Sequence, residues 1–470
     1  MNSISAPPPA ADRRLILLIT TTSSFLTPFM GSALNIALPS IGAEFGLDAV
    51  ALGWVATSYM LAAAVFLVPF GRLADIAGRK KIFISGVILY TAASLLSALA
   101  VSGSMLIAVR VLQGWGGSMI FGTATALLIS VYPPGQRGAA LGINTAAVYT
   151  GLSLGPVLGG LLTQSFGWRS IFLLHAGLGA LLTALVLLLL KQEWREARGE
   201  PFDAAGSLLF GLALVSLMYG FSRLPDAPGF VLIGAGTCLA ALFLRYETKI
   251  AHPVLNLSLF LRNRIFAFSN LAALINYSAT AASGFLLSLY LQYVKGLSPR
   301  QAGLVLVAQP VVMAVVSPLT GRLSDRIEPR WLASAGMALS AGGLFLLAFL
   351  QIGSPLSVVT GCLVLLGMGF GLFSSPNTNA VMSSVDKRSL GVASATLATM
   401  RLTGQMFSMG MSLLVIALYL GRVRITAANH PAFMDGLRSA YFIFVAFCAA
   451  GVFASLARGR TPGRRRPESG

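Results

Sequence analysis

Two arginine side chains lie inside long apolar stretches of the chain. Arg110 is part of LIAVRVLQGWGGS, and Arg401 is part of LATMRLTGQMF. A charge within a membrane span costs at least ~2.5–3.5 kcal/mol on insertion scales, so a functional role is the first hypothesis for Arg110. The alternative is an arginine near the membrane edge whose guanidinium group reaches water.

Groups that could carry a proton through such a membrane are scarce. Every Asp and Glu falls at a span edge, in a loop or in a tail, whereas a proton relay in a membrane normally uses buried Asp, Glu or His. His175 remains as a candidate, because imidazole titrates in the physiological range; a structural histidine near the outer end of its span is the alternative. If both arginines line a cavity, two cations without a carboxylate favour neutral, zwitterionic or anionic substrates over lipophilic cations.

These residues are positioned by a chain built largely of apolar runs. Of its 470 residues, 56% are hydrophobic and 10% are charged, against roughly 25% charged in soluble globular proteins. A helix needs about 20 apolar residues to cross the hydrocarbon core, and fourteen runs of that kind predict an all-α polytopic membrane protein with fourteen transmembrane helices. The predicted spans lie near 15–38, 50–70, 82–101, 104–129, 138–163, 171–190, 204–221, 229–245, 265–290, 299–320, 331–351, 355–378, 390–420 and 438–457.

The distribution of basic residues predicts the orientation of these spans. With the N-terminus inside, the tails and inner loops hold 24 of the 33 Lys and Arg residues, and the outer loops hold 7. Inner loops of membrane proteins carry this excess, and a miscount by one span would scramble it. We therefore expect a multi-pass protein with both termini in the cytoplasm, and a first span that is retained instead of removed as a signal peptide.

An internal repeat predicts two related halves. GRLAD at 71–75 recurs as GRLSD at 321–325, and each string joins the second and third helices of a six-helix set. Many secondary transporters are built from such repeats, with the substrate site near the midplane between them. The predicted domains are a cytoplasmic N-terminal tail at 1–14, an N-terminal six-helix half at 15–190, an inserted two-helix linker at 204–245, a C-terminal six-helix half at 265–457 and a basic cytoplasmic tail at 458–470.

Composition and motifs argue against other classes of protein. The formal charge of +18 comes from short clusters between apolar runs, not from the patch that a nucleic-acid surface needs. The three cysteines fall in separate apolar runs and have no metal-like spacing. The spans carry no nucleophile–base pair and no ligand cluster, and no ATP-binding loop is found. We therefore expect a protein that is not an enzyme and has no cofactor, no metal and no nucleic-acid partner.

The segment GRLADIAGRKK at 71–81 is a very short turn between two spans. Glycine permits close helix approach and unusual backbone angles, and an Asp there can accept from a helix N-terminus or pair with a basic residue. The string resembles the signature loop of the major facilitator superfamily, G-x-L-a-D-x-x-G-r-k. The resemblance implies a conformational latch that joins the halves in the outward-facing state. Its residues would be Gly71, Asp75, Gly78 and Arg79, with a degenerate second copy at Gly321, Arg322 and Asp325.

Two strings within spans resemble further motifs of this superfamily. RVLQGWG matches R-x-x-q-G-x-g, which implies a coupling role for Arg110 and Gln113 beside His175, the candidate proton carrier. GLSLGPVLGG has glycines four residues apart, which make a face for close helix packing in any membrane bundle, and a proline that bends the helix. It is similar to a motif found chiefly in exporters and antiporters of the superfamily. Its residues are Gly151, Gly155, Pro156, Gly159 and Gly160.

Three more strings narrow the resemblance to the fourteen-span drug:proton antiporter family of the multidrug efflux type. They are FGWRSIFLLH at 166–175, FDAAG at 202–206 and RYETKIAHPVLNLSLFLRNRIF at 245–266, and the likeness covers about 30–457. The first span departs from the family pattern. The family's intramembrane Asp, usually tied to proton coupling or to cationic substrates, aligns here with Met30.

The resemblance implies a secondary active transporter that exports small amphipathic, drug-like molecules by alternating access, coupled to protons. We expect a monomer in a lipid bilayer, with a bacterial inner membrane preferred. The alternative is a dedicated exporter or uniporter of a single neutral, zwitterionic or anionic metabolite, lipid-like molecule or peptide. Buried polar groups can also simply bond neighbouring helices, so about half of the following are expected to line the substrate cavity: Asn35, Tyr149, Asn276, Tyr277, Asn377, Asn379, Arg401 and Gln405.

Overall fold

A computed structural model describes residues 10–133, 136–190, 192–195, 197, 199–250, 253–255, 257–324, 326–386 and 390–459. Within these ranges the chain is helical between its loops and forms no strand. Fourteen helical segments of the described residues are long and apolar enough to cross a membrane. The predicted all-α fold and the predicted number of spans are therefore confirmed.

Six long helices make up the first half of the molecule. Two of them begin at a side-chain cap that satisfies a free N-terminal amide: Asp48 Oδ1 accepts from Ala51 N at 2.7 Å, and Ser102 Oγ accepts from Met105 N at 3.2 Å. The helices are α1 (Ala10–Phe45), α2 (Ala49–Ala77), α3 (Arg79–Ala98), α4 (Gly103–Val131), α5 (Arg137–Phe166) and α6 (Arg169–Leu189).

A helical hairpin separates this half from the second. It consists of α7 (Ala204–Arg223) and α8 (Ala227–Glu247). The second half opens with a short helix, α9 (Leu257–Arg262), that hydropathy does not predict. The remaining elements are α10 (Arg264–Thr280), α11 (Ser283–Leu289), a π-helical turn (Tyr290–Val294), α12 (Pro299–Leu306), α13 (Ala308–Leu323), α14 (Pro329–Leu347), α15 (Leu356–Ser383), α16 (Leu390–Tyr419), a 3₁₀ turn (Ala427–Asn429) and α17 (His430–Ala457).

Two predicted spans of the second half are interrupted. Between α10 and α11, the amide of Ala282 donates to the Ser408 hydroxyl of α16 at 3.0 Å, so a neighbouring helix takes a bond that a continuous helix would make internally. Between α12 and α13, Pro310 follows the break and has no N–H to offer the Leu306 carbonyl one turn earlier. A hydropathy profile detects neither a bond across helices nor a local backbone break.

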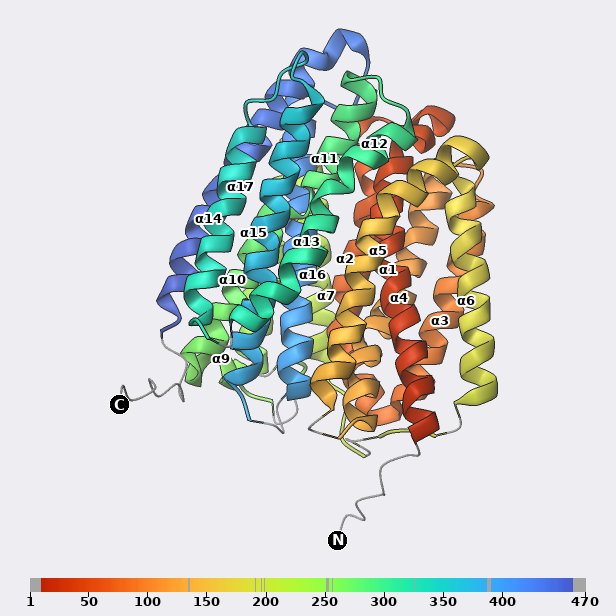
Figure 1. The fold of residues 1–470 in the computed structure, drawn as a ribbon, viewed down its shortest axis with the longest axis vertical. Coiled ribbons are helices and arrows are strands. Elements are labelled where there is room, and N and C mark those ends of the chain that lie inside the picture. The colour runs from red at the N-terminus through yellow and green to blue at the C-terminus, as the bar shows by residue number, and fades with distance from the viewer. Residues whose placement is uncertain are drawn as a thin grey trace.

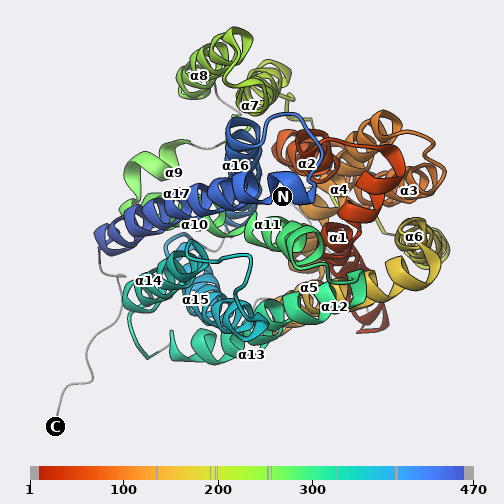
Figure 2. The ribbon, with the colours of Figure 1, turned by 90° about the horizontal axis from the view of Figure 1, so that it is seen from above.

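The spans form two bundles that lie side by side (Figure 1). The start of α1 and the end of α17 lie at the same end of the molecule, which we call the terminal end; the opposite end is the far end. Seen along the helices, the α7–α8 hairpin lies outside both bundles, next to α2 and α16 (Figure 2).

Helix α7 touches one helix from each half. Toward α2, the ring of Tyr219 packs against Trp54 with centroids 6.1 Å apart. Toward α16, the ring of Phe221 meets Phe407 edge-on, again at 6.1 Å. The inserted pair is thus attached to both halves through α7.

Candidate functional site

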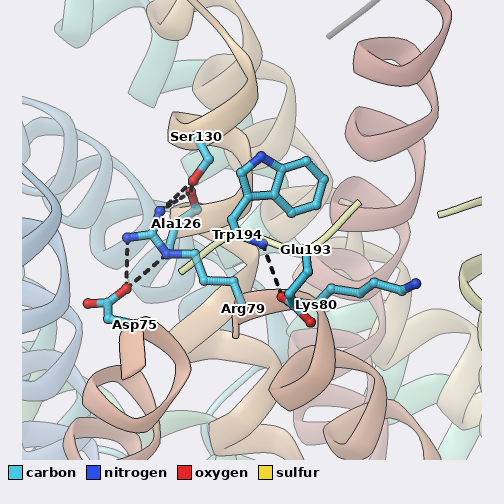
Figure 3. A network of polar contacts seen from close by, with 7 residues as sticks. All are labelled: Asp75, Arg79, Lys80, Ala126, Ser130, Glu193 and Trp194. Atoms are coloured by element: carbon cyan, nitrogen blue, oxygen red, sulfur yellow. Dashed lines mark hydrogen bonds and ion pairs between the residues drawn. The ribbon is translucent and has the colours of Figure 1, made fainter. Parts of the chain in front are cut away.

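The signature loop is organised by an arginine–carboxylate pair (Figure 3). Arg79 Nη2 lies 2.7 Å from Asp75 Oδ1, and Arg79 Nε donates to the same oxygen at 2.9 Å. The guanidinium group also donates to the carbonyl of Ala126, at 3.3 Å, and to the hydroxyl of Ser130, both on α4. Because Arg79 is only 5% exposed, this charge-assisted network ties α2 and α3 to α4 inside the first half.

The chain between α6 and α7 crosses this loop and binds it. The Glu193 carboxylate accepts from the backbone amides of Lys80 and Lys81, at 2.8 and 3.1 Å, in the first turn of α3. A negative charge is favoured there because helix amides point outward from the N-terminus. The amide of Arg79 donates to the Trp194 carbonyl at 2.9 Å. Nothing in the motif itself predicts this cover over the loop.

The same chain continues along the end of α2. The amide of Ala197 donates to the Asp75 carbonyl at 3.0 Å, and Glu200 forms an ion pair with Arg72. Gly71, at the other end of the motif, lies close to Gly122 of α4. These contacts are made within the first half and with the chain before α7, so a latch between the halves stays a prediction for another state of the protein.

Gly78 has a backbone conformation that depends on glycine. Its φ is +125°, and a Cβ atom there would lie 2.5 Å from the Glu193 carboxyl carbon. We expect Gly78→Ala to destabilise the protein by about 1–3 kcal/mol, the usual cost of backbone strain, which thermal unfolding of the purified protein would measure. Gly142→Ala is the control, because Gly142 is an exposed helical glycine with open space around it. Equal Tm values for the two variants would contradict the prediction.

The second copy of the motif is only partly described. Gly321 and Arg322 end α13, with Arg322 exposed, and Asp325 lies outside the described residues. Asn379 of α15, a predicted cavity residue, donates to the hydroxyl of Ser324 at 2.9 Å. Asn379 therefore bonds the end of α13.

Arg110 is buried in the middle of the first half and is 1% exposed. Its Nε donates to the Val55 carbonyl of α2 at 3.2 Å, and its Nη1 donates to the Gln113 side-chain oxygen. Gln113 Nε2 in turn donates to Ser94 Oγ of α3 at 2.8 Å. The guanidinium carbon lies 4.5 Å from the centre of the Tyr59 ring, a cation–π contact. The alternative of a snorkelling arginine is thus wrong, and the cation is held by neutral groups.

His175 is fully buried between α1, α3 and α6. Its Nδ1 lies 2.8 Å from the Ile171 carbonyl and its Nε2 lies 3.2 Å from the Leu26 carbonyl. The imidazole stacks on Phe29 at 5.1 Å and faces Tyr90 at 6.5 Å. A neutral imidazole can donate through only one nitrogen, whereas an imidazolium would satisfy both carbonyls. The coupling role of His175 stays a prediction.

The glycine-rich face of α5 packs directly against α1. Cβ atoms at Gly151, Gly155 and Gly159 would each lie within 2.6 Å of an α1 atom, in Phe25, Ser32 and Ala33. Backbones this close need glycine. This close approach is what glycines four residues apart allow, and the antiporter-type role of the motif stays a prediction.

Helix α5 also touches the second half through glycines. A Cβ atom at Gly160 would lie 2.5 Å from the Pro299 carbonyl oxygen at the start of α12. A Cβ atom at Gly303 of α12 would lie 2.1 Å from the Pro156 carbonyl oxygen. The predicted motif thus forms part of the contact between the halves, and Gly303 completes it.

Further bonds join the two halves toward the far end. The amide of Ala49 donates to the Val423 carbonyl at 3.1 Å, and Arg424 Nε donates to the Gly46 carbonyl, also at 3.1 Å. Deeper in the bundle, Ser288 Oγ donates to the Asn35 carbonyl at 2.6 Å. Asn35, a predicted cavity residue, therefore lies at the closed contact between the halves.

A polar and aromatic cluster lies between the halves at the level of α5 and α15. Tyr149 of the first half donates to the Ser374 hydroxyl of the second at 3.3 Å. Tyr277 packs edge-on against Phe370 at 5.2 Å, and these two rings cluster with Tyr149 and Met313. We call Tyr149, Tyr277, Phe370 and Met313, together with Arg401, the central cluster.

Arg401 supplies the positive charge of this cluster. Its Nη2 donates to Thr378 Oγ1 at 2.6 Å, and its guanidinium carbon lies 5.8 Å from the Tyr277 ring centre. Its Nε is buried and has no partner among the described residues. Gln405 follows one helical turn later, half-buried on the same side of α16. One donor of the guanidinium group is therefore unsatisfied within the described part of the chain.

The remaining predicted cavity residues lie elsewhere. Asn377 Nδ2 donates to the Ser269 carbonyl at 3.1 Å, and Asn377 Oδ1 accepts from Arg458 at 3.2 Å. Burial lowers the pKa of Arg458 to about 10 and Glu328 opposes this shift, so the guanidinium stays charged at neutral pH. Asn276 is fully buried, and both ends of its amide lack partners within the described part of the chain.

Sequence reasoning missed three residues that shape the site. Each of them contacts a segment that is far away in the sequence. Two lie in loops, Glu193 and Arg424, and the third, Gly303, lies in the short helix α12. Gly303 could have been suspected from the spacing of small residues in its span, but a single glycine is a weak signal. The other two have no local signature.

Comparisons with known proteins agree with this architecture. The family model described as Major Facilitator Superfamily matches residues 20–409 and 269–470. Riboflavin transporter RibZ of Clostridioides difficile (strain 630) is 32% identical over 377 residues, which cover 80% of this chain and 82% of RibZ. The lincomycin resistance protein of Streptomyces lincolnensis is 36% identical over 373 residues, which cover 77% of this chain and 76% of that protein.

Solved structures share the fold. A crystal structure of a bacterial homologue of the human lysosomal transporter Spinster, inward-facing and unoccupied, aligns with a TM-score of 0.69 and 19% identity, over 96% of this chain and 98% of that one. One assignment follows from four observations: the two halves, the fourteen spans, the signature loop between α2 and α3, and the family match. The chain is a multi-pass membrane transporter and belongs to the Major Facilitator Superfamily.

Proposed function

We propose that this transporter exports small amphipathic, drug-like molecules by alternating access of its two halves, coupled to protons. The central cluster supports the proposal most directly, because it offers aromatic faces and one cation where the two halves meet. Aromatic faces bind flat amphipathic molecules with little dependence on their hydrogen-bonding pattern. A relative named as a lincomycin resistance protein supports a drug-like substrate.

The proposal includes the orientation of the protein in the membrane and the conformational state of the structure. The 24 basic residues of the predicted inner loops and tails favour both termini in the cytoplasm. We take the protein to be a monomer in a bacterial inner membrane. In that orientation the far end faces outward, and its direct contacts between the halves correspond to an inward-facing state. Asp75 and Arg79 would then exchange partners when the signature loop meets the second half in the outward-facing state.

A second candidate function is export or uniport of one non-cationic molecule. One observation in its favour is Arg401, whose Nε lacks a partner among the described residues. Another is Met30, a buried apolar residue that aligns with the intramembrane Asp of the antiporter family that the sequence resembles. The Arg401 guanidinium forms no ion pair among the described residues, so its charge repels a lipophilic cation from a low-dielectric site. One relative is named as a riboflavin transporter.

Ethidium accumulation in efflux-deficient bacteria tests the main proposal. Cells expressing the protein are expected to accumulate less ethidium than empty-vector cells, and an ionophore that collapses the proton gradient is expected to abolish the difference. Unchanged accumulation, with the protein verified in the membrane, would reject export of cationic drugs and favour the second candidate. A difference that survives the ionophore would reject proton coupling.

A further inference from the structure

Two carboxyl groups are buried together where the inserted hairpin joins the two halves. Asp203 precedes α7 and is 8% exposed, and Glu247 ends α8 and is 3% exposed. Both residues lie at span edges in the sequence, where carboxylates are ordinarily solvated, so their burial is a finding of the structure. A buried carboxylate is costly unless it is paired or hydrogen-bonded.

Each carboxyl group has one satisfied oxygen. Asp203 Oδ1 accepts from the amide of Gly206 at 2.8 Å, in the first turn of α7. Glu247 Oε2 accepts from the amide of Leu255 at 3.1 Å, in the chain that leads into the second half. The pair therefore connects α7, α8 and the beginning of the second half.

The second oxygen of each group faces the other residue. Asp203 Oδ2 and Glu247 Oε1 are both buried and have no donor among the described residues. Both lie beside Gly206: a Cβ atom there would be 2.1 Å from Asp203 Oδ2 and 2.5 Å from Glu247 Oε1. The two oxygens are therefore close to each other, because both lie against the same point beside Gly206. Two ionised carboxylates cannot bond each other, because neither carries a donor.

The described surroundings supply no ion pair to these carboxyl groups. Within the described part of the chain, no Lys or Arg side chain forms an ion pair with Asp203 or Glu247. Among the described residues, Tyr246 is a further titratable neighbour, and its hydroxyl lies within hydrogen-bonding reach of Asp203. Two like charges in contact in a poorly solvated site disfavour the doubly ionised form.

We propose that Asp203 and Glu247 form a proton-binding site, in which one proton is shared between Asp203 Oδ2 and Glu247 Oε1. The proton supplies the donor that both oxygens lack and removes the repulsion between two anions. The pair titrates as a unit. The site lies at the edge of the inserted hairpin and not in the central cluster, so it does not depend on the export proposal.

The folded protein then holds a proton at neutral pH that the unfolded chain releases, because unfolded Asp and Glu ionise near about pH 3.9 and 4.3. Folding stability therefore falls as the pH rises through the titration of the pair. For the purified protein in detergent, we expect the Tm to fall by about 2 °C or more when the pH is raised from about 6 to about 9.

Infrared difference spectra of the full chain test the proton directly. Raising the pH should remove a C=O stretching band of a protonated carboxylic acid. That band should be missing in both Glu247→Gln and Asp203→Asn, and the Tm of both variants should depend less on pH, because an amide donates in place of the proton. Either variant suffices if the other does not reach the membrane.

Asp226→Asn is the matched control, because Asp226 is an exposed carboxylate at the opposite end of the same hairpin. It should keep both the band and the pH dependence of the wild type. A wild-type band that persists in both variants would overturn the proposal. So would the absence of the band in the wild type, with a Tm that instead rises on addition of sodium or calcium, because the pair would then hold a metal cation.

Discussion

Gly303→Leu is expected to abolish transport. A Cβ atom at position 303 would lie 2.1 Å from the Pro156 carbonyl oxygen, and a backbone atom in a helix cannot move aside as a flexible side chain can. Helix α12 would have to separate from α5, which would open the contact between the halves. A transporter that cannot close one end cannot alternate, so we expect loss of at least about 90% of export activity, measured by dye accumulation at equal protein level.

A thiol-labelling experiment separates this effect from misfolding. In a cysteine-free background, Asn35→Cys places a thiol at the closed contact, where it should react slowly with a water-soluble reagent. Adding Gly303→Leu should accelerate the labelling. The matched control is Gly361→Leu, because Gly361 is an exposed helical glycine with open space around it. Full transport activity in Gly303→Leu would show that the far-end contact is not needed for the cycle.

Arg401→Gln is expected to impair transport of anionic molecules selectively. The guanidinium group lies in the central cluster, and its Nε has no partner among the described residues. A charge-assisted hydrogen bond to a ligand contributes ~1.5–3 kcal/mol, which corresponds to about 10- to 100-fold in apparent KM. The measurement compares an anionic dye such as carboxyfluorescein with ethidium, in cells expressing the wild type or the variant.

Two further variants make the Arg401 test specific. Arg401→Lys keeps the charge and should restore part of the activity toward the anionic dye. Arg223→Gln removes a guanidinium group at the far end of α7. Among the described residues, that group donates hydrogen bonds only to the Tyr219 hydroxyl. The variant should therefore transport both dyes as the wild type does. Equal losses for the anion and the cation in Arg401→Gln would indicate a structural role and not one in charge selection.

Most of the membrane architecture could be predicted from the sequence, because it follows from local composition. The number of spans depends on the length of apolar runs, and the close packing of α5 on α1 depends on glycines four residues apart. Arg110 stood out for the same reason, as one charge in an apolar run. Such features need no knowledge of which segments meet in space.

The site could be predicted only in part, because it is formed by segments that are distant in the sequence. Tyr149, Tyr277 and Arg401 do meet, but Asn377 and Asn379 bond neighbouring elements. A polar residue in a helix has a direction that hydropathy does not report. The burial of Asp203 and Glu247 was hidden in the same way, since solvation at a span edge depends on the elements that cover it.

The position of α7 restricts how the halves can move. Because α7 contacts α2 through Tyr219 and α16 through Phe221, a wide separation of the halves along that side would break at least one of these aromatic contacts. On the side of the bundle away from α7, the halves meet directly through α5 and α12, with no inserted helix between them in the described part of the chain. The inserted hairpin would therefore set the axis of rotation close to α7. In the transport cycle, the two halves would then separate mainly on the side of the bundle away from α7.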